Sequence, residues 1–151
     1  MKTKTSWKEK LEKPQEIKIV DTPEGMQKFG TGKMLIATPK IIDDFVRKIP
    51  KGQLITISEI RKSLAEEYNA DVTCPLTTGI FLRISAEAAE EDRASGKRNI
   101  TPYWRVVRDN GCLIDKFPGG QSHQAELLEK EGFKTKQKGK NLFVVSDKFN
   151  Q

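Results

Sequence analysis

The first clear periodicity of apolar residues predicts an amphipathic helix in the first third of the chain. Between Ile41 and Ile49 the apolar side chains recur at the intervals of three and four residues that place them on one helix face. Thr38 can cap such a helix, and Pro39 suits its first turn. The apolar run Met34–Ala37 just before it is short enough for a strand. A strand followed by a helix is therefore expected from 34 to 49.

Two further helices are expected between residues 58 and 92. Ser58 is the expected cap of one helix, which runs from Glu59 to about Glu67. After a turn, Thr73 is the expected cap of the next, with Pro75 inside its first turn. This helix should run to about Asp92. Its expected core-facing stripe comprises Leu76, Ile80, Phe81, Ile84 and Ala88.

Short β-branched or apolar runs predict the strands. The run 54–57 and the pair Val106–Val107 are of this kind, and Asn110–Gly111 predicts a tight turn that pairs the second with 112–114 as a hairpin. A helix around Leu127–Leu128 and a closing strand at 141–145 follow. Two helices joined by a turn, then a hairpin and a final helix, predict an α/β (α+β) fold built on a winged helix-turn-helix with short peripheral strands.

The organisation along the chain predicts one domain with two flanking segments. A length of 151 residues suits a single core. Residues 1–33 are expected to form an N-terminal arm, partly ordered or packed as a flap through Trp7 and Leu11, which are spaced i, i+4. Residues 34–146 form the predicted winged-helix domain, and 147–151 a tail.

Charge and composition narrow the classes of function. Residues 1–51 carry 12 basic and 7 acidic side chains, residues 52–92 carry 3 and 8, and residues 93–151 carry 12 and 6. The net +6 favours an acidic partner, commonly nucleic acid, although lysine-rich surfaces also serve solubility alone. No apolar run approaches the ~20 residues of a membrane helix, and the basic N-terminus lacks a signal-like stretch, so a cytoplasmic protein is expected.

The sequence predicts neither a metal nor a cofactor. Its two cysteines, Cys74 and Cys112, lack metal-ligand spacing, and the single histidine, His123, does not complete a ligand set. Reduced thiols in a cytosol are the simpler interpretation. No phosphate-binding glycine motif is present.

The stretch around the Asn-Gly turn resembles a known family. The chain reads Pro-Tyr-Trp-Arg-Val-Val at 102–107, Gly111, Phe-Pro-Gly-Gly at 117–120, and Leu-Leu-Glu-Lys-Glu-Gly at 127–132. In order and spacing this resembles the O6-alkylguanine-DNA alkyltransferases (methylated-DNA–protein-cysteine methyltransferases) and their inactive alkyltransferase-like relatives, over roughly residues 34–133. Their signature is Pro-Cys-His-Arg-Val-Val, a glycine-containing turn, an aromatic, a small residue and Gly-Gly, then Leu-Leu-x-x-Glu-Gly. The resemblance implies the C-terminal, DNA-binding domain of that family.

The departures from the family pattern remove its chemistry. Tyr103 stands where the family has its nucleophilic cysteine, and Trp104 where it has histidine. A phenol with a reference pKa of ~10 beside an indole cannot replace an activated thiolate. Ile57 stands at the position of the tyrosine that rotates the target phosphate, and Leu76 at that of the arginine that fills the vacated base stack. The resemblance therefore implies a non-catalytic, alkyltransferase-like DNA-binding protein in DNA repair.

Two groups of residues are candidates for the site. The helix after Thr73 and its basic flanks are expected to contact nucleic acid through Thr73, Thr77, Thr78, Arg83, Arg93, Lys97, Arg98 and Arg108. A pocket for an altered or extruded base is expected at Tyr103, Trp104, Arg105 and Glu131. Arg105 either holds a phosphate or carbonyl, or pairs with Glu131. Of the two aromatic residues, we assign Trp104 to the core and Tyr103 to the pocket.

Two other functions remain open at this stage. The first is an enzyme of unknown chemistry that uses the remodelled pocket through Cys74 or Tyr103, since a helix N-terminus lowers a thiol pKa. The second is a protein-interaction module whose contact surface is acidic, formed by Glu87, Glu90, Glu91 and Asp92. This acidic run is also the main sequence argument against DNA binding, because it would repel the phosphate backbone.

Overall fold

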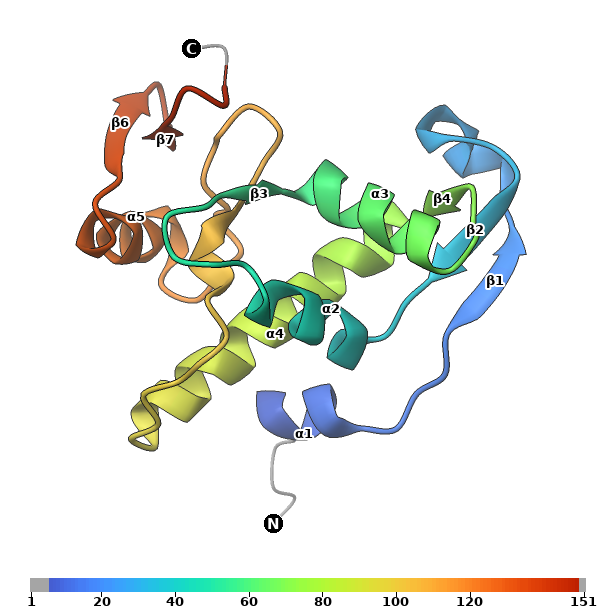
Figure 1. The fold of residues 1–151 in the computed structure, drawn as a ribbon, viewed down its shortest axis with the longest axis horizontal. Coiled ribbons are helices and arrows are strands. Elements are labelled where there is room, and N and C mark those ends of the chain that lie inside the picture. The colour runs from blue at the N-terminus through green and yellow to red at the C-terminus, as the bar shows by residue number, and fades with distance from the viewer. Residues whose placement is uncertain (1–5, 150–151) are drawn as a thin grey trace.

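A computed structural model describes residues 6–149, which combine helices with short strands, as the expected mixed α/β class requires (Figure 1). The helices are α1 Trp7–Glu12, η1 Glu24–Phe29, α2 Pro39–Arg47, α3 Ile57–Glu67, α4 Pro75–Ala94, η2 Tyr103–Arg105 and α5 Gly120–Lys130, where η marks a 3-10 helix. The strands are β1 Lys18–Asp21, β2 Lys33–Ile36, β3 Ile55–Thr56, β4 Val72–Thr73, β5 Val106–Val107, β6 Lys134–Lys138 and β7 Asn141–Val145.

The strands form three small sheets around a helical core. β1 pairs antiparallel with β2, which pairs parallel with β4, while β3–β5 and β6–β7 are separate pairs. The main apolar cluster joins side chains of α2, α3 and α4 to Tyr103 and Val106. A smaller cluster lies under α5 and β7 and includes Leu113, Leu128 and Val144. Helix α4 runs diagonally through the molecule and packs against α1, α2, α3 and η2 (Figure 1).

Helix α2 begins as expected, whereas α3 begins two residues earlier. Thr38 accepts a hydrogen bond from the amide of Ile41 and caps α2, with Pro39 in the first turn. The prediction that Ser58 caps α3 is wrong. Thr56 is the cap, because its hydroxyl accepts from the amide of Glu59 while the Glu59 carboxylate accepts from the amide of Thr56.

The start and the buried face of α4 also differ from expectation. Thr73 does not cap the helix, because it pairs with Leu35 in the sheet and donates its hydroxyl to the Arg61 carbonyl. Cys74 takes the cap position without a side-chain bond. The predicted stripe is wrong for Leu76 and Ile80, which are exposed. Small side chains form the buried face instead and let α1 and α2 approach closely: Thr78, Ser85, Ala86, Ala88 and Ala89, together with Leu82.

The turn at Asn110–Gly111 forms, but the hairpin ladder expected beyond it does not. β5 pairs in parallel with β3, and Cys112 bridges to Phe143 of β7 instead of pairing with β5. The reason is that the backbone after the turn hydrogen-bonds to β7 through Leu113 and Gly111. The helix around Leu127–Leu128 and the closing strand are confirmed as α5 and β7.

Most of the predicted N-terminal arm folds onto the rest of the chain. α1 packs on α4 with Leu11 buried, and β1 extends the sheet beside β2 (Figure 1). The domain boundaries themselves stay a prediction, and residues 1–5 and 150–151 of the expected arm and tail lie outside the described residues. No helix within residues 6–149 has the length and apolar character needed to cross a membrane.

Candidate nucleic-acid interface

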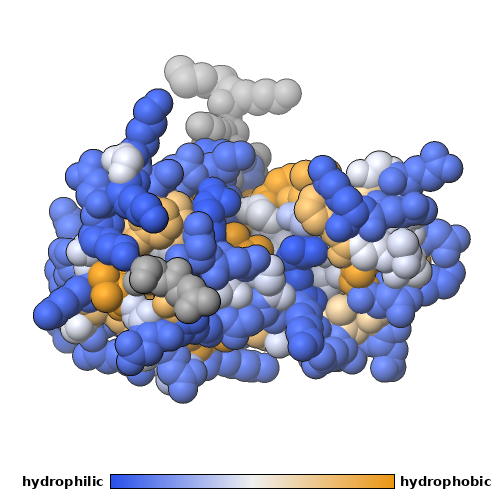
Figure 2. Space-filling view, turned by 90° about the horizontal axis from the view of Figure 1, so that it is seen from above, coloured by the Kyte–Doolittle hydropathy of each residue, from blue (hydrophilic) through white to orange (hydrophobic). Residues whose placement is uncertain are grey.

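The first turns of α4 present an apolar face to solvent. Leu76 and Ile80 are 67% and 57% exposed, and with Arg83 they occupy positions i, i+4 and i+7 on one side of the helix. The face of the molecule in Figure 2 is largely hydrophilic, with apolar residues in separate patches. Exposed leucine and isoleucine side chains one helical turn apart make this face a candidate contact surface.

A cleft of about 530 Å³ adjoins this face. Aromatic and aliphatic side chains from α1, α3, α4 and the loop after β5 line it, among them Trp7, Ile57, Leu76, Ile80, Ile114 and Phe117. Four cationic residues also line it: Lys10, Arg83, Arg108 and Lys116. In the described part of the chain, no acidic side chain lines this cleft. The cleft therefore combines an apolar floor with positive charge at its edges.

Three of the four cations make contacts within the chain. The Lys10 ammonium lies 4.1 Å and the Arg83 guanidinium carbon 5.4 Å from the centre of the Trp7 ring, so both rest on its π-system. Arg108 makes a 3.1 Å ion pair with Asp115. Both side chains of that pair are exposed, so the pair is weak and a phosphate can compete for the arginine.

The three threonines predicted to contact nucleic acid do not present their hydroxyls outward. Thr73 and Thr78 are 1% exposed, and the Thr78 hydroxyl donates to the Cys74 carbonyl at 2.7 Å. Thr77 is half-buried and donates to the same carbonyl at 3.5 Å. For Thr73 and Thr78 the prediction is therefore wrong, because at this helix start the hydroxyls hydrogen-bond the chain's own backbone.

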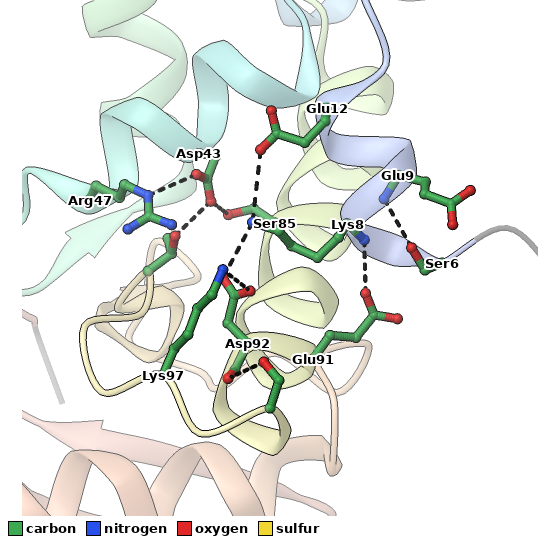
Figure 3. Close-up of polar contacts among 12 residues, drawn as sticks. Ser6, Lys8, Glu9, Glu12, Asp43, Arg47, Ser85, Glu91, Asp92 and Lys97 are labelled. Atoms are coloured by element: carbon green, nitrogen blue, oxygen red, sulfur yellow. Dashed lines mark hydrogen bonds and ion pairs between the residues drawn. The ribbon is translucent and has the colours of Figure 1, made fainter.

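The acidic end of α4 is neutralised from within the chain (Figure 3). Glu91 accepts hydrogen bonds from the amides of Trp7 and Lys8, the first two residues of α1. A carboxylate at a helix N-terminus satisfies free amides and the positive end of the helix dipole. Asp92 is buried and forms ion pairs with Lys8 at 3.4 Å and Lys97 at 3.3 Å. These two acids therefore stabilise the docking of α1.

The Glu90 carboxylate is also bonded within the chain. Its carboxylate accepts from the Tyr103 hydroxyl at 2.6 Å, from Arg93 at 2.9 Å, and lies 3.2 Å from His123 Nε2. Burial would raise the pKa of Glu90, but these donors outweigh burial and lower the pKa below its ordinary value. Glu90, Glu91 and Asp92 are thus bonded within the chain, so this part of the acidic run repels a phosphate backbone less than the sequence alone suggests.

The predicted base pocket is closed at Tyr103. Tyr103 is fully buried, with its ring edge-on to Trp104 and Phe117 at centroid distances of 5.3 and 5.2 Å. Burial, and then the hydrogen bond to Glu90, raise the pKa of the Tyr103 hydroxyl well above 10. The assignment of Tyr103 to the pocket and Trp104 to the core is reversed, because Trp104 is the half-buried residue and lines a cavity.

Arg105 and Glu131 pair with each other. Arg105 donates from Nε and Nη2 to the two Glu131 oxygens at 2.9 and 2.6 Å, and from Nη1 to the Ile49 carbonyl at 2.6 Å. The two side chains are 13% and 9% exposed. Burial would raise the pKa of Glu131, but the Arg105 bonds lower it below its ordinary value. Of the two interpretations of Arg105, the geometry supports the structural pair.

The predicted basic contacts divide between two places. Arg83 and Arg108 line the cleft at the start of α4. Arg93, Lys97 and Arg98 lie at or beyond its other end, and the ten residues from Arg83 to Arg93 span about 15 Å of helix. Arg93 and Lys97 make ion pairs with Glu90 and Asp92. The cleft residues Lys10, Lys116 and Trp7 were missed, because nothing in the sequence places residues 7–10 beside residues 76–84.

The candidate nucleophiles are inaccessible. Cys74 and Cys112 are free thiols, both buried, and the Tyr103 hydroxyl is held by Glu90. His123 is half-buried, and its Nε2 lies 3.2 Å from the Glu90 carboxylate. Within residues 6–149, no group of three or more His, Cys, Asp and Glu side chains is arranged to hold a metal ion.

Comparison with known proteins adds two structural likenesses. No protein-family model and no curated protein matches the chain. A solved structure of S. pombe ATL in complex with DNA matches with 18% identity and a TM-score of 0.49. Another, of S. pombe Atl1 in complex with damaged DNA containing O6-carboxymethylguanine, matches with 19% identity and a TM-score of 0.48. Each match covers 72% of this chain and 87% of the other.

Proposed function

We propose that this protein is a non-catalytic, alkyltransferase-like DNA-binding protein that acts in DNA repair. It docks through the first turns of α4 and the cleft beside them. The observation that carries the proposal is the exposed pair Leu76 and Ile80 beside a cleft lined by four cations and no acidic side chain in the described residues. A DNA duplex presents the matching chemistry, with phosphates for the cations and base and sugar surfaces for the apolar side chains.

In this proposal each group has a role. Lys10, Arg83, Arg108 and Lys116 contact backbone phosphates on either side of the cleft. Leu76, at the position where the resembled family has its intercalating arginine, acts as an aliphatic wedge between base steps. The cleft, with Trp7 and Phe117 in its walls, receives an altered or extruded base. This replaces the closed region at Tyr103 as the base pocket.

The winged helix-turn-helix belongs to the same proposal. α3 and α4, joined by residues 68–74, take the part of the helix pair, with α4 as the recognition helix. The β6–β7 hairpin takes the part of the wing, and the exposed lysines of β6 alternate at 134, 136 and 138. A cytoplasmic location accords with this role.

Fluorescence anisotropy tests the proposal. The intact protein is titrated into a short labelled duplex with and without one O6-methylguanine, at low and at moderate salt. We expect binding that weakens as salt rises, and tighter binding to the modified duplex. Equal affinity for both duplexes would refute base recognition in the cleft. Absence of binding even at low salt would refute the DNA-binding role altogether.

A further inference from the structure

A second cavity lies away from the proposed DNA interface, beside η2 and the loop that follows α4. It has a volume of about 340 Å³. Its lining is rich in guanidinium groups and includes one aromatic ring: Arg47, Arg98, Asn99, Ile100, Pro102, Trp104 and Arg105. No carboxylate lines it in the described part of the chain. None of these residues lines the cleft at the start of α4.

Two of the three arginines are held in place by hydrogen bonds to buried or nearly buried carboxylates. Arg47 donates from Nε to Asp43 at 3.0 Å, and Asp43, which is 1% exposed, is itself held by the hydroxyls of Ser85 and Thr101 (Figure 3). Arg105 is fixed by Glu131. Because these arginine side chains are already ordered, they lose little further rotamer entropy when a ligand binds.

The arginines also retain donors for a ligand. Within residues 6–149, the two terminal nitrogens of Arg47 make no hydrogen bond, and the exposed Arg98 has neither a hydrogen bond nor an ion pair. A planar guanidinium with two free N–H groups matches a phosphate bidentately. Two such groups from different elements, α2 and the loop after α4, converge on one cavity with the side-chain amide of Asn99.

Trp104 supplies a different kind of contact at the same place. Its ring is half-buried in the cavity wall, and the guanidinium carbons of Arg93 and Arg105 each lie 5.8 Å from its centre. Because these guanidinium groups already lie over its ring, Trp104 offers a nucleobase van der Waals contact with the part of the ring exposed in the cavity wall, and not an open stacking face. The small volume favours a single nucleotide over a larger ligand.

We infer that this cavity is a second ligand site, which binds a nucleotide phosphate monoester. Arg47 and Arg98 hold the phosphate, and Trp104 packs against the base. This goes beyond the proposed function, because the site shares no lining residue with the cleft and does not require duplex DNA. The same chemistry is offered by a free nucleoside 5′-monophosphate and by the 5′-phosphorylated end of a DNA strand.

Tryptophan fluorescence and calorimetry test the inference. The chain has two tryptophans, so Trp7→Phe leaves Trp104 as the sole reporter. We expect GMP to change its fluorescence saturably, and guanosine to bind at least about tenfold more weakly, because it lacks the phosphate. Titration calorimetry of the unaltered protein with GMP checks that the Trp7→Phe change itself does not alter the affinity. If GMP and guanosine bind equally, or neither binds, the inference is overturned.

Paired variants separate this site from the DNA interface. Arg98→Gln should weaken GMP binding about tenfold and leave duplex binding unchanged, whereas Arg83→Gln should do the reverse. Both side chains are exposed, so neither change should unfold the protein. Unaltered GMP affinity in Arg98→Gln would refute the assignment whatever the duplex result. A tetranucleotide with and without a 5′-phosphate identifies the source, since tighter binding than GMP indicates a strand end and weaker binding a free nucleotide.

Discussion

Arg83 and Arg105 occupy contrasting surroundings. Arg105 donates to both oxygens of Glu131 and to a carbonyl, and is nearly buried. Arg83 stands on the outer face of α4, where its guanidinium rests on the ring of Trp7 beside an open cleft. From sequence, Arg83 was a candidate nucleic-acid contact, and Arg105 was either a ligand contact or the partner of Glu131. The structure shows Arg105 in the pair with Glu131.

Under the proposed function, the difference means that unsatisfied donors, and not motif position, identify the candidate ligand-binding arginine. A guanidinium whose donors are all bonded internally contributes to stability and has no donor left for a partner. One whose N–H groups are not bonded internally can donate them to a phosphate. The same distinction separates the two ends of α4, where the carboxylates at the C-terminal end are bonded and the apolar residues at the N-terminal end are free.

Removal of the Arg105 partner should produce the largest effect on stability. Glu131→Ala leaves a nearly buried guanidinium without its carboxylate, so the free energy of unfolding should fall by about 3–5 kcal/mol. Urea denaturation measures this. Glu126→Ala, on the exposed face of α5, is the control and should change stability by less than ~0.5 kcal/mol. A loss below 1 kcal/mol in Glu131→Ala would contradict a structural role for the pair.

The exposed face of α4 should show the opposite pattern. Leu76→Asn and Ile80→Asn should each weaken duplex binding about tenfold, the result of losing ~1.5 kcal/mol of apolar burial at the interface. Their unfolding free energies should change by less than ~0.5 kcal/mol. Ile19→Asn changes an exposed residue of β1 outside the cleft and is the control. If all three bind DNA alike, the face of α4 is not the interface.

The bonded carboxylates should make stability depend on pH in the acid range. The pKa values of Glu90 and Glu131 are lowered in the folded chain. Their contribution is therefore complete above the ordinary value of 4.5 and is lost as pH falls through the lower folded values. When the urea midpoint of unfolding is measured from pH 7 to pH 3, it should decrease once the pH drops below about 4.5. The midpoint of Glu131→Gln should fall less steeply, and equal slopes would count against the pair.

Tyr103 should act at the other end of the pH scale. Its pKa is raised, so the folded chain holds the phenolic proton more tightly than the unfolded chain. The stability that this provides is complete below the ordinary value of 10 and declines as pH rises above it. Tyr103→Phe should lessen that decline, as thermal unfolding between pH 8 and pH 11 would show. An unchanged profile would mean that the hydroxyl is not held by Glu90.

The smallest expected effect concerns single charges at the cleft. Arg83→Gln removes one phosphate contact, so the slope of log K against log salt should become shallower by about 1. Lys130→Gln, an exposed lysine at the end of α5, is the matched control and should leave the slope unchanged. Equal slopes for both variants would show that Arg83 does not contact the backbone.

The sequence by itself determined the local elements. The cap at Thr38, the apolar period after it, and the runs that form α5 and β7 depend on residues within one or two turns of each other, so each pattern identified its element. Even the cap of α3 was present locally, since Thr56 and Glu59 have the spacing of a capping box. Ser58 was predicted as the cap although this local spacing pointed to Thr56.

Only the tertiary structure decided which groups are free. An apolar period fits either face of α4, and the packing of α1 and α2 on its small residues left Leu76 and Ile80 outside. The Glu91 carboxylate accepts hydrogen bonds from backbone amides 83 and 84 positions away in the chain. Arg105 meets Glu131 across 26 positions. Charge and burial depend on neighbours in space, which a linear pattern does not specify.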